Sequence, residues 1–224
     1  MIDTTPFSSN PQSPLALTSI GHLLLRPRLF FSNVSALVKK PEALIVAWVS
    51  GIAYAIGRID TNMMKADLGG ARPGWQTLGP WLTDSWVNYW IFVLAFGVLN
   101  GWILWYFGGW WYRKRLQWSG VANADPIAVR ATYVYQDLVQ SGPTLLFTLG
   151  QTVFFQNYAE AWNAEEYLSM LLVVFIFWSC VTSYKAATTY ADIGWKARMW
   201  FLILPIALYV VALGVIGTLY ALLQ

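Results

Sequence analysis

Long apolar runs alternate with short polar segments along most of the chain. The runs cover about residues 42–59, 86–107, 143–162, 167–186 and 199–223. Each run is close to the ~20 residues with which a helix crosses about 30 Å of hydrocarbon. Polar side chains at Gln151, Gln156 and Asn157 interrupt the third run. The pattern predicts an all-α, polytopic membrane protein with five transmembrane helices.

Two other segments have the periodicity of amphipathic helices. In residues 27–40 the apolar side chains Phe30, Phe31, Val34, Leu37 and Val38 share one helical face. In residues 126–141 one face holds Ile127, Ala131, Val134, Tyr135 and Leu138. Asp125 and Pro126 suit the start of this second helix, and Gly142–Pro143 suits its end. We expect both segments to be surface helices at the cytoplasmic face of the membrane.

The rest of the chain divides simply. Residues 1–25 begin with a stretch rich in Pro, Ser and Thr, which predicts a disordered N-terminal tail. Residues 26–224 are expected to form a single membrane domain with five spans. Residues 60–84 contain Gly–Gly, Pro–Gly and Gly–Pro pairs and are expected to form turns outside the membrane.

Basic residues are distributed unequally between the two sides that five spans define. The N-terminal side holds Arg26, Arg28, Lys39, Lys40, Arg113, Lys114, Arg115, Arg130, Lys185, Lys196 and Arg198. The other side holds only Arg58, Lys65 and Arg72. Since loops rich in Lys and Arg stay in the cytoplasm, the N-terminus is predicted to be cytoplasmic and the C-terminus to lie outside.

Composition supports the membrane assignment. Apolar residues make up 57% of the chain and charged residues 11%, against roughly 45–50% and about 25% in soluble domains. So few charges exclude a typical soluble enzyme. The net charge of +3 comes from residues that flank apolar runs, so no nucleic-acid partner is expected. Abundant Trp and sparse Lys favour a bacterial inner membrane.

The motifs of familiar enzyme classes are absent from the sequence. There is one His, His22, and one Cys, Cys180, too few for a typical metal site. No nucleophile elbow, zinc-protease motif, P-loop or dinucleotide fingerprint occurs. We therefore expect neither an enzyme nor a cofactor. No charged residue falls near the centre of a predicted span, which leaves Gln151, Gln156 and Asn157 as the main polar groups there. They are interpreted either as interhelical hydrogen-bonding groups or as a polar path.

Two motifs near the second run have structural and functional interpretations. Trp110 and Trp111 precede the basic triplet Arg113, Lys114 and Arg115. This aromatic belt and basic cluster predicts contact with acidic lipids or with a partner, although anchoring of the topology would give the same pattern. Within the run, residues 97–101 form a G-x-x-x-G motif, which indicates close helix packing and is compatible with a homo-oligomer.

The layout resembles that of the Yip family (Ypt/Rab-interacting proteins), and in particular its bacterial branch. The residues that carry the resemblance are Pro27, Phe30, Phe31 and Pro41, the stretch from Ala131 to Tyr135 before Pro143, Trp178, Tyr184 and Ala186, and Trp195, Lys196, Ala197 and Pro205. The resemblance covers about residues 26–222. In place of the Asp-Leu-Tyr-Gly-Pro signature of eukaryotic members, residues 136–138 read Gln-Asp-Leu. The resemblance implies five spans and a role in membrane trafficking or shaping.

Two functional hypotheses follow from the sequence. The first is a non-enzymatic membrane protein that organises the membrane or binds a protein or lipid partner through its surface helices and the basic triplet. The second is a small-solute transporter, channel or permease subunit that uses the polar third span. A polar face lining a hydrated cavity would favour transport, whereas a dry interface would favour simple packing.

Overall fold

A computed structural model describes residues 13–32, 38, 41–70, 73–164, 171–191 and 194–223, and for 219–223 it describes the backbone only. Every regular element in these ranges is helical, and no strand occurs in them. The prediction of an all-α protein is confirmed.

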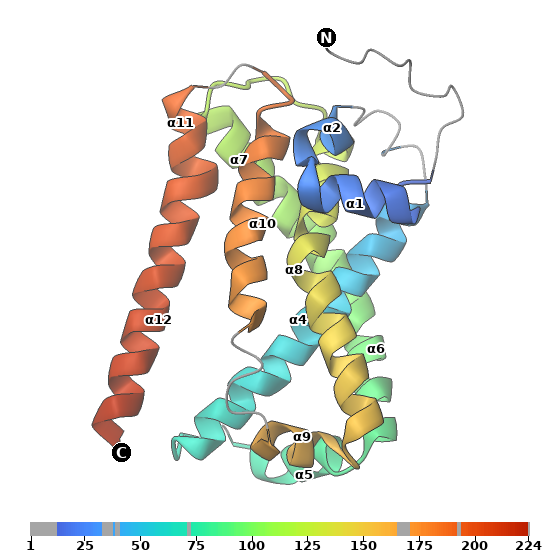
Figure 1. Cartoon of the computed structure of the whole chain (residues 1–224), viewed down its shortest axis with the longest axis vertical. Coiled ribbons are helices and arrows are strands. Elements are labelled where there is room, and N and C mark those ends of the chain that lie inside the picture. Colours follow the sequence, from blue (N-terminus) through green and yellow to red (C-terminus); the bar gives the residue numbers. More distant parts are fainter. Residues whose placement is uncertain are drawn as a thin grey trace.

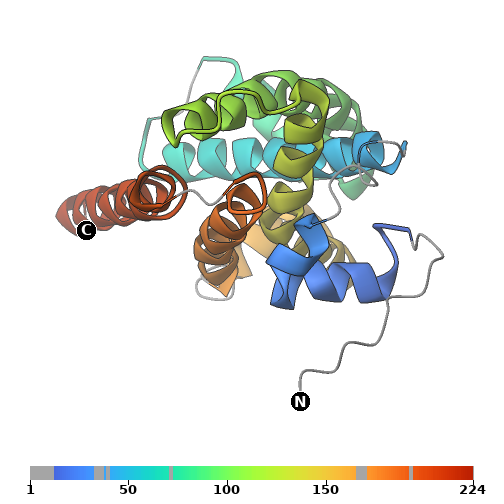
Figure 2. The ribbon, with the colours of Figure 1, turned by 90° about the horizontal axis from the view of Figure 1, so that it is seen from above.

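Five long helical segments form a bundle (Figure 1). They are α4 (Glu42–Asp67), α6 (Trp86–Ile103) with α7 (Gly109–Trp118), α8 (Pro126–Phe154), α10 (Leu172–Ala187), and α11 (Trp195–Arg198) with α12 (Leu204–Leu223). A π-helical turn joins α6 to α7 at Leu104–Gly108, and another joins α11 to α12 at Met199–Ile203. Seen from above, α8 lies in the interior of the bundle, and it contacts α4, α7 and α10 (Figure 2).

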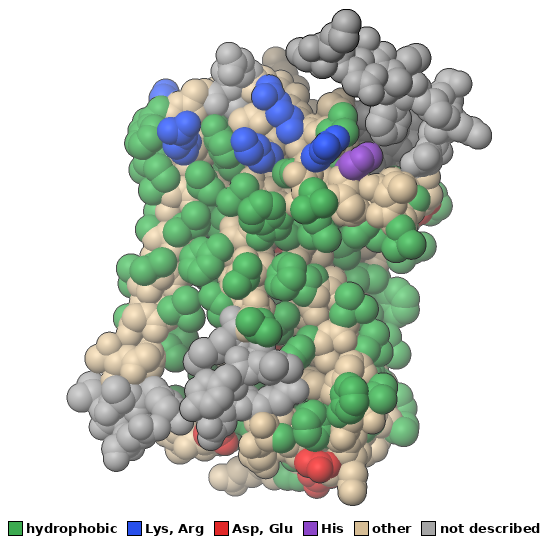
Figure 3. All heavy atoms as spheres, viewed as in Figure 1, with side chains coloured by type: hydrophobic (Ala, Val, Ile, Leu, Met, Phe, Trp, Pro, Cys, Tyr) green, Lys and Arg blue, Asp and Glu red, His purple; other side chains and the backbone are tan. Residues whose placement is uncertain are grey.

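Short helices cover the two ends of the bundle. At one end α1 (Leu17–Leu25) and α2 (Pro27–Phe31) lie across the long helices. The opposite end carries α5 (Trp75–Thr83) and α9 (Tyr158–Ala164), together with the last turns of α12. On the face shown in Figure 3, Lys and Arg side chains gather at the α1 end, whereas the acidic side chains lie mainly at the other end.

Three helical segments of the described chain are long and apolar enough to cross a membrane. They are Glu42–Asp67, Trp86–Trp118 and Trp195–Thr218. Helix α10 is apolar but shorter. Large apolar side chains such as Ile91, Val98 and Val211 are exposed along these helices, as expected where lipid takes the place of water. The chain is therefore an all-helical membrane protein.

Helix α8 corrects the sequence analysis. The surface helix at 126–141 was expected to end at Gly142–Pro143, but α8 continues through Pro143 to Phe154. Proline removes one backbone hydrogen bond, and interior helices tolerate this loss where neighbouring helices pack around them. The third apolar run therefore ends earlier than residue 162, and its last part forms the separate helix α9.

The remaining helix boundaries also differ from the expected ones. The predicted tail at residues 1–25 is wrong from Leu17 onward, where α1 begins, while residues 1–12 lie outside the described residues. Helix α2 confirms the start of the helix expected at 27–40, but residues 33–37, 39 and 40 are not described. Helix α4 extends to Asp67, and α5 occupies part of the expected turn region. The turns there are confined to the neighbourhood of Gly69 and Gly74, whose positive φ angles of 72° and 86° suit glycine.

Helix α9 is fastened to the end of α4 by side-chain hydrogen bonds. The Tyr158 hydroxyl donates to the Asp60 carboxylate, and Trp162 Nε1 donates to Asp67 Oδ2 over 2.9 Å. Trp86 Nε1 donates to the carbonyl oxygen of Phe155 over 2.9 Å and so connects the start of α6 to the end of α8. These contacts hold three segments that are distant in sequence together at one end of the bundle.

Candidate functional site

Helix α8 carries a buried carboxylate, that of Asp137. The side chain of Asp137 is only 7% exposed, and its Oδ2 atom has no hydrogen-bond partner. The Ser50 hydroxyl of α4 interacts with the same carboxylate. A buried charge without full compensation is costly and therefore uncommon in proteins. Asp137 is consequently the first candidate for a functional residue.

The unbroken course of α8 explains why this carboxylate is deep in the protein. With a rise of about 1.5 Å per residue, Asp137 stands about 17 Å from the first residue of α8 and about 26 Å from the last. Had the helix ended at Pro143, Asp137 would lie in its last turns. Instead the helix continues between α4 and α10, so Asp137 lies well inside α8 and away from its ends.

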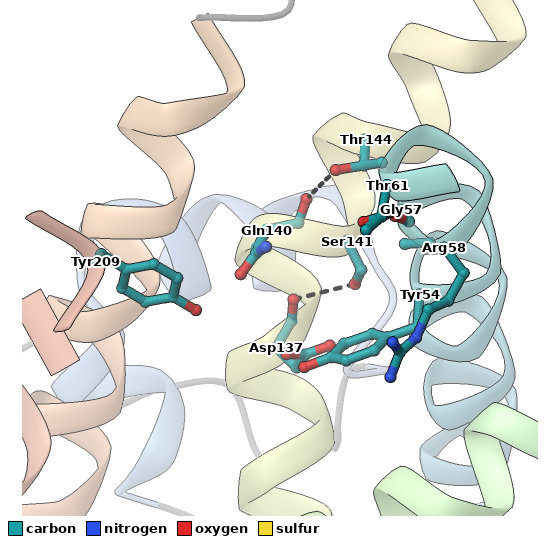
Figure 4. A pocket seen from close by; sticks show the side chains of 10 residues that line it. Tyr54, Gly57, Arg58, Thr61, Asp137, Gln140, Ser141, Thr144 and Tyr209 are labelled. Carbon is teal, nitrogen blue, oxygen red and sulfur yellow. Dashed lines mark hydrogen bonds between the residues drawn. The ribbon is translucent and has the colours of Figure 1, made fainter. Parts of the chain in front are cut away.

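Asp137 lines a cavity between α4, α8 and α12 (Figure 4). Its volume is about 290 Å³, close to the lower end of the range of about 300–1,000 Å³ for small-molecule sites. The lining residues are Ala53, Tyr54, Gly57, Arg58, Thr61, Asp137, Gln140, Ser141, Thr144 and Tyr209. The cavity is open at the side, since Tyr54 is 44% and Tyr209 38% exposed.

The small hydroxyl groups of the lining are engaged with the protein itself. Ser141 Oγ donates to the carbonyl oxygen of Asp137 over 3.0 Å, and it also lies 3.1 Å from Ser50 Oγ of α4. Thr144 Oγ1 donates to the Gln140 carbonyl over 3.0 Å, and Thr61 Oγ1 donates to the Gly57 carbonyl over 2.7 Å. These bonds fix the hydroxyls, whose lone pairs still face the cavity as acceptors.

The larger polar side chains of the lining are directed into the cavity. The phenol of Tyr209 points from α12 toward α8, and the Gln140 side chain extends from α8 on the same side (Figure 4). From α4, the ring of Tyr54 reaches toward Asp137. Three helices thus supply an acid, an amide and two phenols to one space, a set that can bind a polar molecule of either charge through hydrogen bonds.

Arg58 contributes the cationic group of the cavity. It belongs to α4, one turn beyond Tyr54. Within the described part of the chain, no ion pair connects Arg58 to Asp137 or to another carboxylate, although the two residues line the same cavity. The cavity therefore presents one positive and one negative side chain that do not neutralise each other by direct contact.

The structure does not bring the residues of the expected polar path into this cavity. Gln151 is buried on α8, 14 positions beyond Asp137, or about 21 Å along the helix. Gln156 and Asn157 lie in the turn between α8 and α9. There Asn157 Oδ1 accepts a hydrogen bond from the Glu160 amide over 2.8 Å, and Glu160 Oε2 accepts from the Gln156 amide over 2.7 Å. The two residues therefore cap α9.

The basic triplet is divided between two environments. Arg115 turns toward the protein, with its guanidinium carbon 4.7 Å from the ring centre of Phe201 and 5.2 Å from that of Tyr112. Arg113 and Lys114 are half-buried, while Trp110 and Trp111 are exposed on the same helix. Consecutive helical residues point in different directions, so the triplet does not form one binding face.

Sequence reasoning missed both charged residues of the cavity. Asp137 belongs to residues 126–141, which were expected to form a surface helix, and Arg58 belongs to the end of the first apolar run, residues 42–59. No charge was expected near the centre of a predicted span, and Asp137 lies outside the predicted spans, on the part of α8 that precedes residue 143. One signal was available: Asp137 and Ser141 are separated by four residues, and Tyr54 and Arg58 likewise, so each pair shares a helical face.

In the described ranges, no three His, Cys, Asp or Glu side chains gather where they could hold a metal ion. The fold and site define a helical membrane protein with a polar, laterally open cavity. Comparison of the chain with protein-family models, with curated proteins and with solved structures gives no significant match.

Proposed function

We propose that this protein is a small-solute transporter or permease subunit whose solute binds beside Asp137. The observation that carries the proposal is the buried carboxylate with an unpartnered Oδ2 atom in a cavity inside the bundle. Ionisable groups at such depth in membrane proteins are rare, and those that occur mark substrate or ion pathways. A packing role is a poorer explanation, because an apolar or amide side chain would fill the position without the cost of a buried charge.

The wall formed by α12 supports this proposal. Its segment is largely exposed in the structure, and α12 and the π-helical turn Met199–Ile203 that precedes it both contact α10. Tyr209 of α12 is nevertheless part of the cavity. A loosely packed wall that carries a binding residue can move with respect to α4 and α8, as the alternating exposure of a solute requires.

The proposal includes five membrane crossings, by α4, α6–α7, α8, α10 and α11–α12. It retains the orientation expected from the sequence, with the α1 end in the cytoplasm, and a bacterial inner membrane as the location. The gathering of Lys and Arg at the α1 end is consistent with this orientation (Figure 3). Reporter fusions that place the two chain ends in different compartments would support the odd number of crossings.

Solute flux across a reconstituted membrane tests the function. Purified protein in liposomes would be given radiolabelled serine, 4-aminobutyrate, ethanolamine, acetate, phosphate and glucose in turn. We expect uptake of at least one of these solutes above that of empty liposomes, and loss of that uptake in Asp137→Asn. Asp84→Asn is the matched control, because Asp84 is exposed at the end of α5 and remote from the cavity. Uptake by Asp137→Asn equal to that of the wild type would overturn the proposal.

The role in membrane organisation remains a second proposal, for which α1 provides the specific observation. Leu17 is 89% exposed and Leu25 79% exposed, and Arg26 and Arg28 follow directly. Exposed leucines beside basic residues are typical of helices in the headgroup layer. The same protein can transport a solute and contact lipids in this way. The resemblance to the Yip family belongs to this second proposal.

Replacement of Leu17 and Leu25 by Ser tests this role. If α1 inserts between headgroups, the variant in liposomes would show greater proteolysis of α1 than the wild type. A control variant, Leu78→Ser, changes an exposed leucine at the opposite end of the bundle. Equal proteolysis of α1 in all three proteins would contradict the interfacial role.

A further inference from the structure

Two opposite charges line the cavity on different helices and remain unpaired. Asp137 is on α8, and Arg58 is on α4. Although both line the same space of about 290 Å³, no ion pair joins them in the described part of the chain. Asp137 Oδ2 has no partner at all. Where a carboxylate and a guanidinium meet within a protein, they commonly form a short, two-pronged contact. The arrangement here keeps them apart.

Asp137 and Arg58 start from different positions along the two helices. Ser50 and Ser141, 3.1 Å apart, hold α4 and α8 together next to Asp137, since Ser141 stands one turn beyond Asp137 on α8. Arg58 stands two turns beyond Ser50 on α4, and its side chain extends back along the helix toward Tyr54 (Figure 4). The lining also includes the small residues Ala53 and Gly57, whose side chains occupy little of the cavity.

We propose that the cavity binds a zwitterion, with the ammonium group of the ligand on Asp137 and its anionic group on Arg58. This inference rests on the proposed function and specifies its substrate class. An ammonium group has three N–H donors, and the free oxygen of the Asp137 carboxylate can accept a hydrogen bond from one of them. The Arg58 guanidinium presents a fork of N–H donors that suits a carboxylate or a phosphate. The ammonium group of the ligand neutralises the buried Asp137 carboxylate and removes the cost of leaving that charge unpaired, while the anionic group of the ligand pairs with the exposed Arg58.

The other lining groups suit the same ligand. Tyr54, Tyr209 and Gln140 provide donors and acceptors around the middle of the cavity (Figure 4). They can bind hydroxyl or amide groups between the two charged ends. A free zwitterion such as an amino acid and the phosphoethanolamine headgroup of a lipid share this chemistry. The lateral opening beside Tyr54 and Tyr209 is compatible with entry from either source.

Binding to the purified wild-type protein in detergent tests the inference without any measurement of flux. The probes are serine, 4-aminobutyrate and phosphoethanolamine as zwitterions, ethanolamine as the cation alone, and acetate as the anion alone. We expect at least one zwitterion to bind at least tenfold more tightly than ethanolamine and acetate. Calorimetric titration gives these affinities. Because the ligands are compared on the wild-type protein, the result does not depend on whether a variant folds.

Two variants then assign the charges. In Arg58→Gln, the zwitterion is expected to bind no more tightly than ethanolamine. In Asp137→Asn, it is expected to bind no more tightly than acetate. Asp84→Asn serves again as the control and is expected to keep the wild-type preference. Ethanolamine or acetate binding as tightly as every zwitterion to the wild type, or an undiminished preference in both variants, would overturn the inference.

An experiment with labelled lipids decides whether the zwitterion is a lipid headgroup or a soluble solute. Nanodiscs that contain spin-labelled phosphatidylethanolamine or phosphatidylglycerol would be compared, with unlabelled phosphoethanolamine and serine as competitors. If the protein retains labelled phosphatidylethanolamine and Asp137→Asn does not, the site binds a lipid headgroup. If free serine binds and labelled phosphatidylethanolamine is not retained, the site binds a soluble solute. If zwitterions bind but no solute is transported, the proposed transport function is refuted and the zwitterion site is not. If ethanolamine is transported equally well by the wild type and by Arg58→Gln, the zwitterion site is refuted and the transport function is not.

Discussion

Gly51 of α4 and Gly97 of α6 lie so close together that a Cβ atom on Gly51 would stand 2.1 Å from the Gly97 carbonyl oxygen. The same atom would stand 2.4 Å from the backbone nitrogen of Gly101. The G-x-x-x-G motif at 97–101 is thus used within one chain, against a third glycine. Backbones can approach in this way only where side chains are missing, and the close approach supplies much of the packing between membrane helices.

Substitution Gly51→Ala is expected to lower the thermal stability of the protein in detergent. The added methyl group would meet backbone atoms that cannot move aside, and such overpacking typically costs about 1–3 kcal/mol. Gly150→Ala is the control, since a Cβ atom there meets nothing within 4 Å and alanine favours the helix by up to about 1 kcal/mol. A thermal midpoint for Gly51→Ala equal to that of the wild type would show that α4 and α6 separate easily.

Asp137→Asn is expected to have opposite effects on stability and on transport. Removal of a buried, poorly compensated charge raises the free energy of unfolding, whereas the loss of the carboxylate removes the solute's partner. Thermal unfolding and uptake into liposomes measure the two effects on the same preparation. A variant that is less stable than the wild type and still transports would mean that Asp137 has a structural role.

Trp178→Phe is expected to loosen the attachment of α1. Trp178 Nε1 on α10 donates a 2.8 Å hydrogen bond to the carbonyl oxygen of Leu24 on α1, and phenylalanine keeps the apolar contact but loses this bond. The net value of about 1 kcal/mol for such a bond corresponds to roughly fivefold faster amide hydrogen exchange in α1. Trp81→Phe, at an exposed tryptophan of α5, should leave that exchange unchanged. Unaltered exchange in both variants would show that other contacts hold α1.

Arg115→Gln and Lys114→Gln are expected to separate stability from lipid binding. The Arg115 guanidinium packs on Phe201 and Tyr112, and its loss should cost roughly 1–2 kcal/mol of stability. Lys114 has no comparable contact in the described structure. Its neutralisation should instead weaken association with anionic lipid in a flotation assay and leave the melting temperature unchanged. If both variants lose lipid association equally and neither loses stability, the inward role of Arg115 is wrong.

The hydropathy of the sequence by itself determines the general architecture of this protein. Runs of about 20 apolar residues have few alternatives to helices in a membrane, because every backbone N–H and C=O must be paired within the segment. Residues 86–107 thus indicated a helix in a membrane environment, and they marked the position of α6. The close packing around Gly97 and Gly101 was likewise signalled by their spacing.

The candidate site could not be found in this way, because its position depends on how helices cross. The sequence pattern of a helix that contains Asp137, Gln140 and Ser141 is the same whether the helix lies on the membrane surface or runs through the bundle. Only the packing of α8 among α4, α7 and α10 carries Asp137 into the interior. In the same way, Arg58 and Tyr209 are 151 positions apart, and no local pattern relates them. Local composition sets which segments are helical and apolar, whereas the depth and neighbours of a charged side chain arise from contacts between segments remote in the chain.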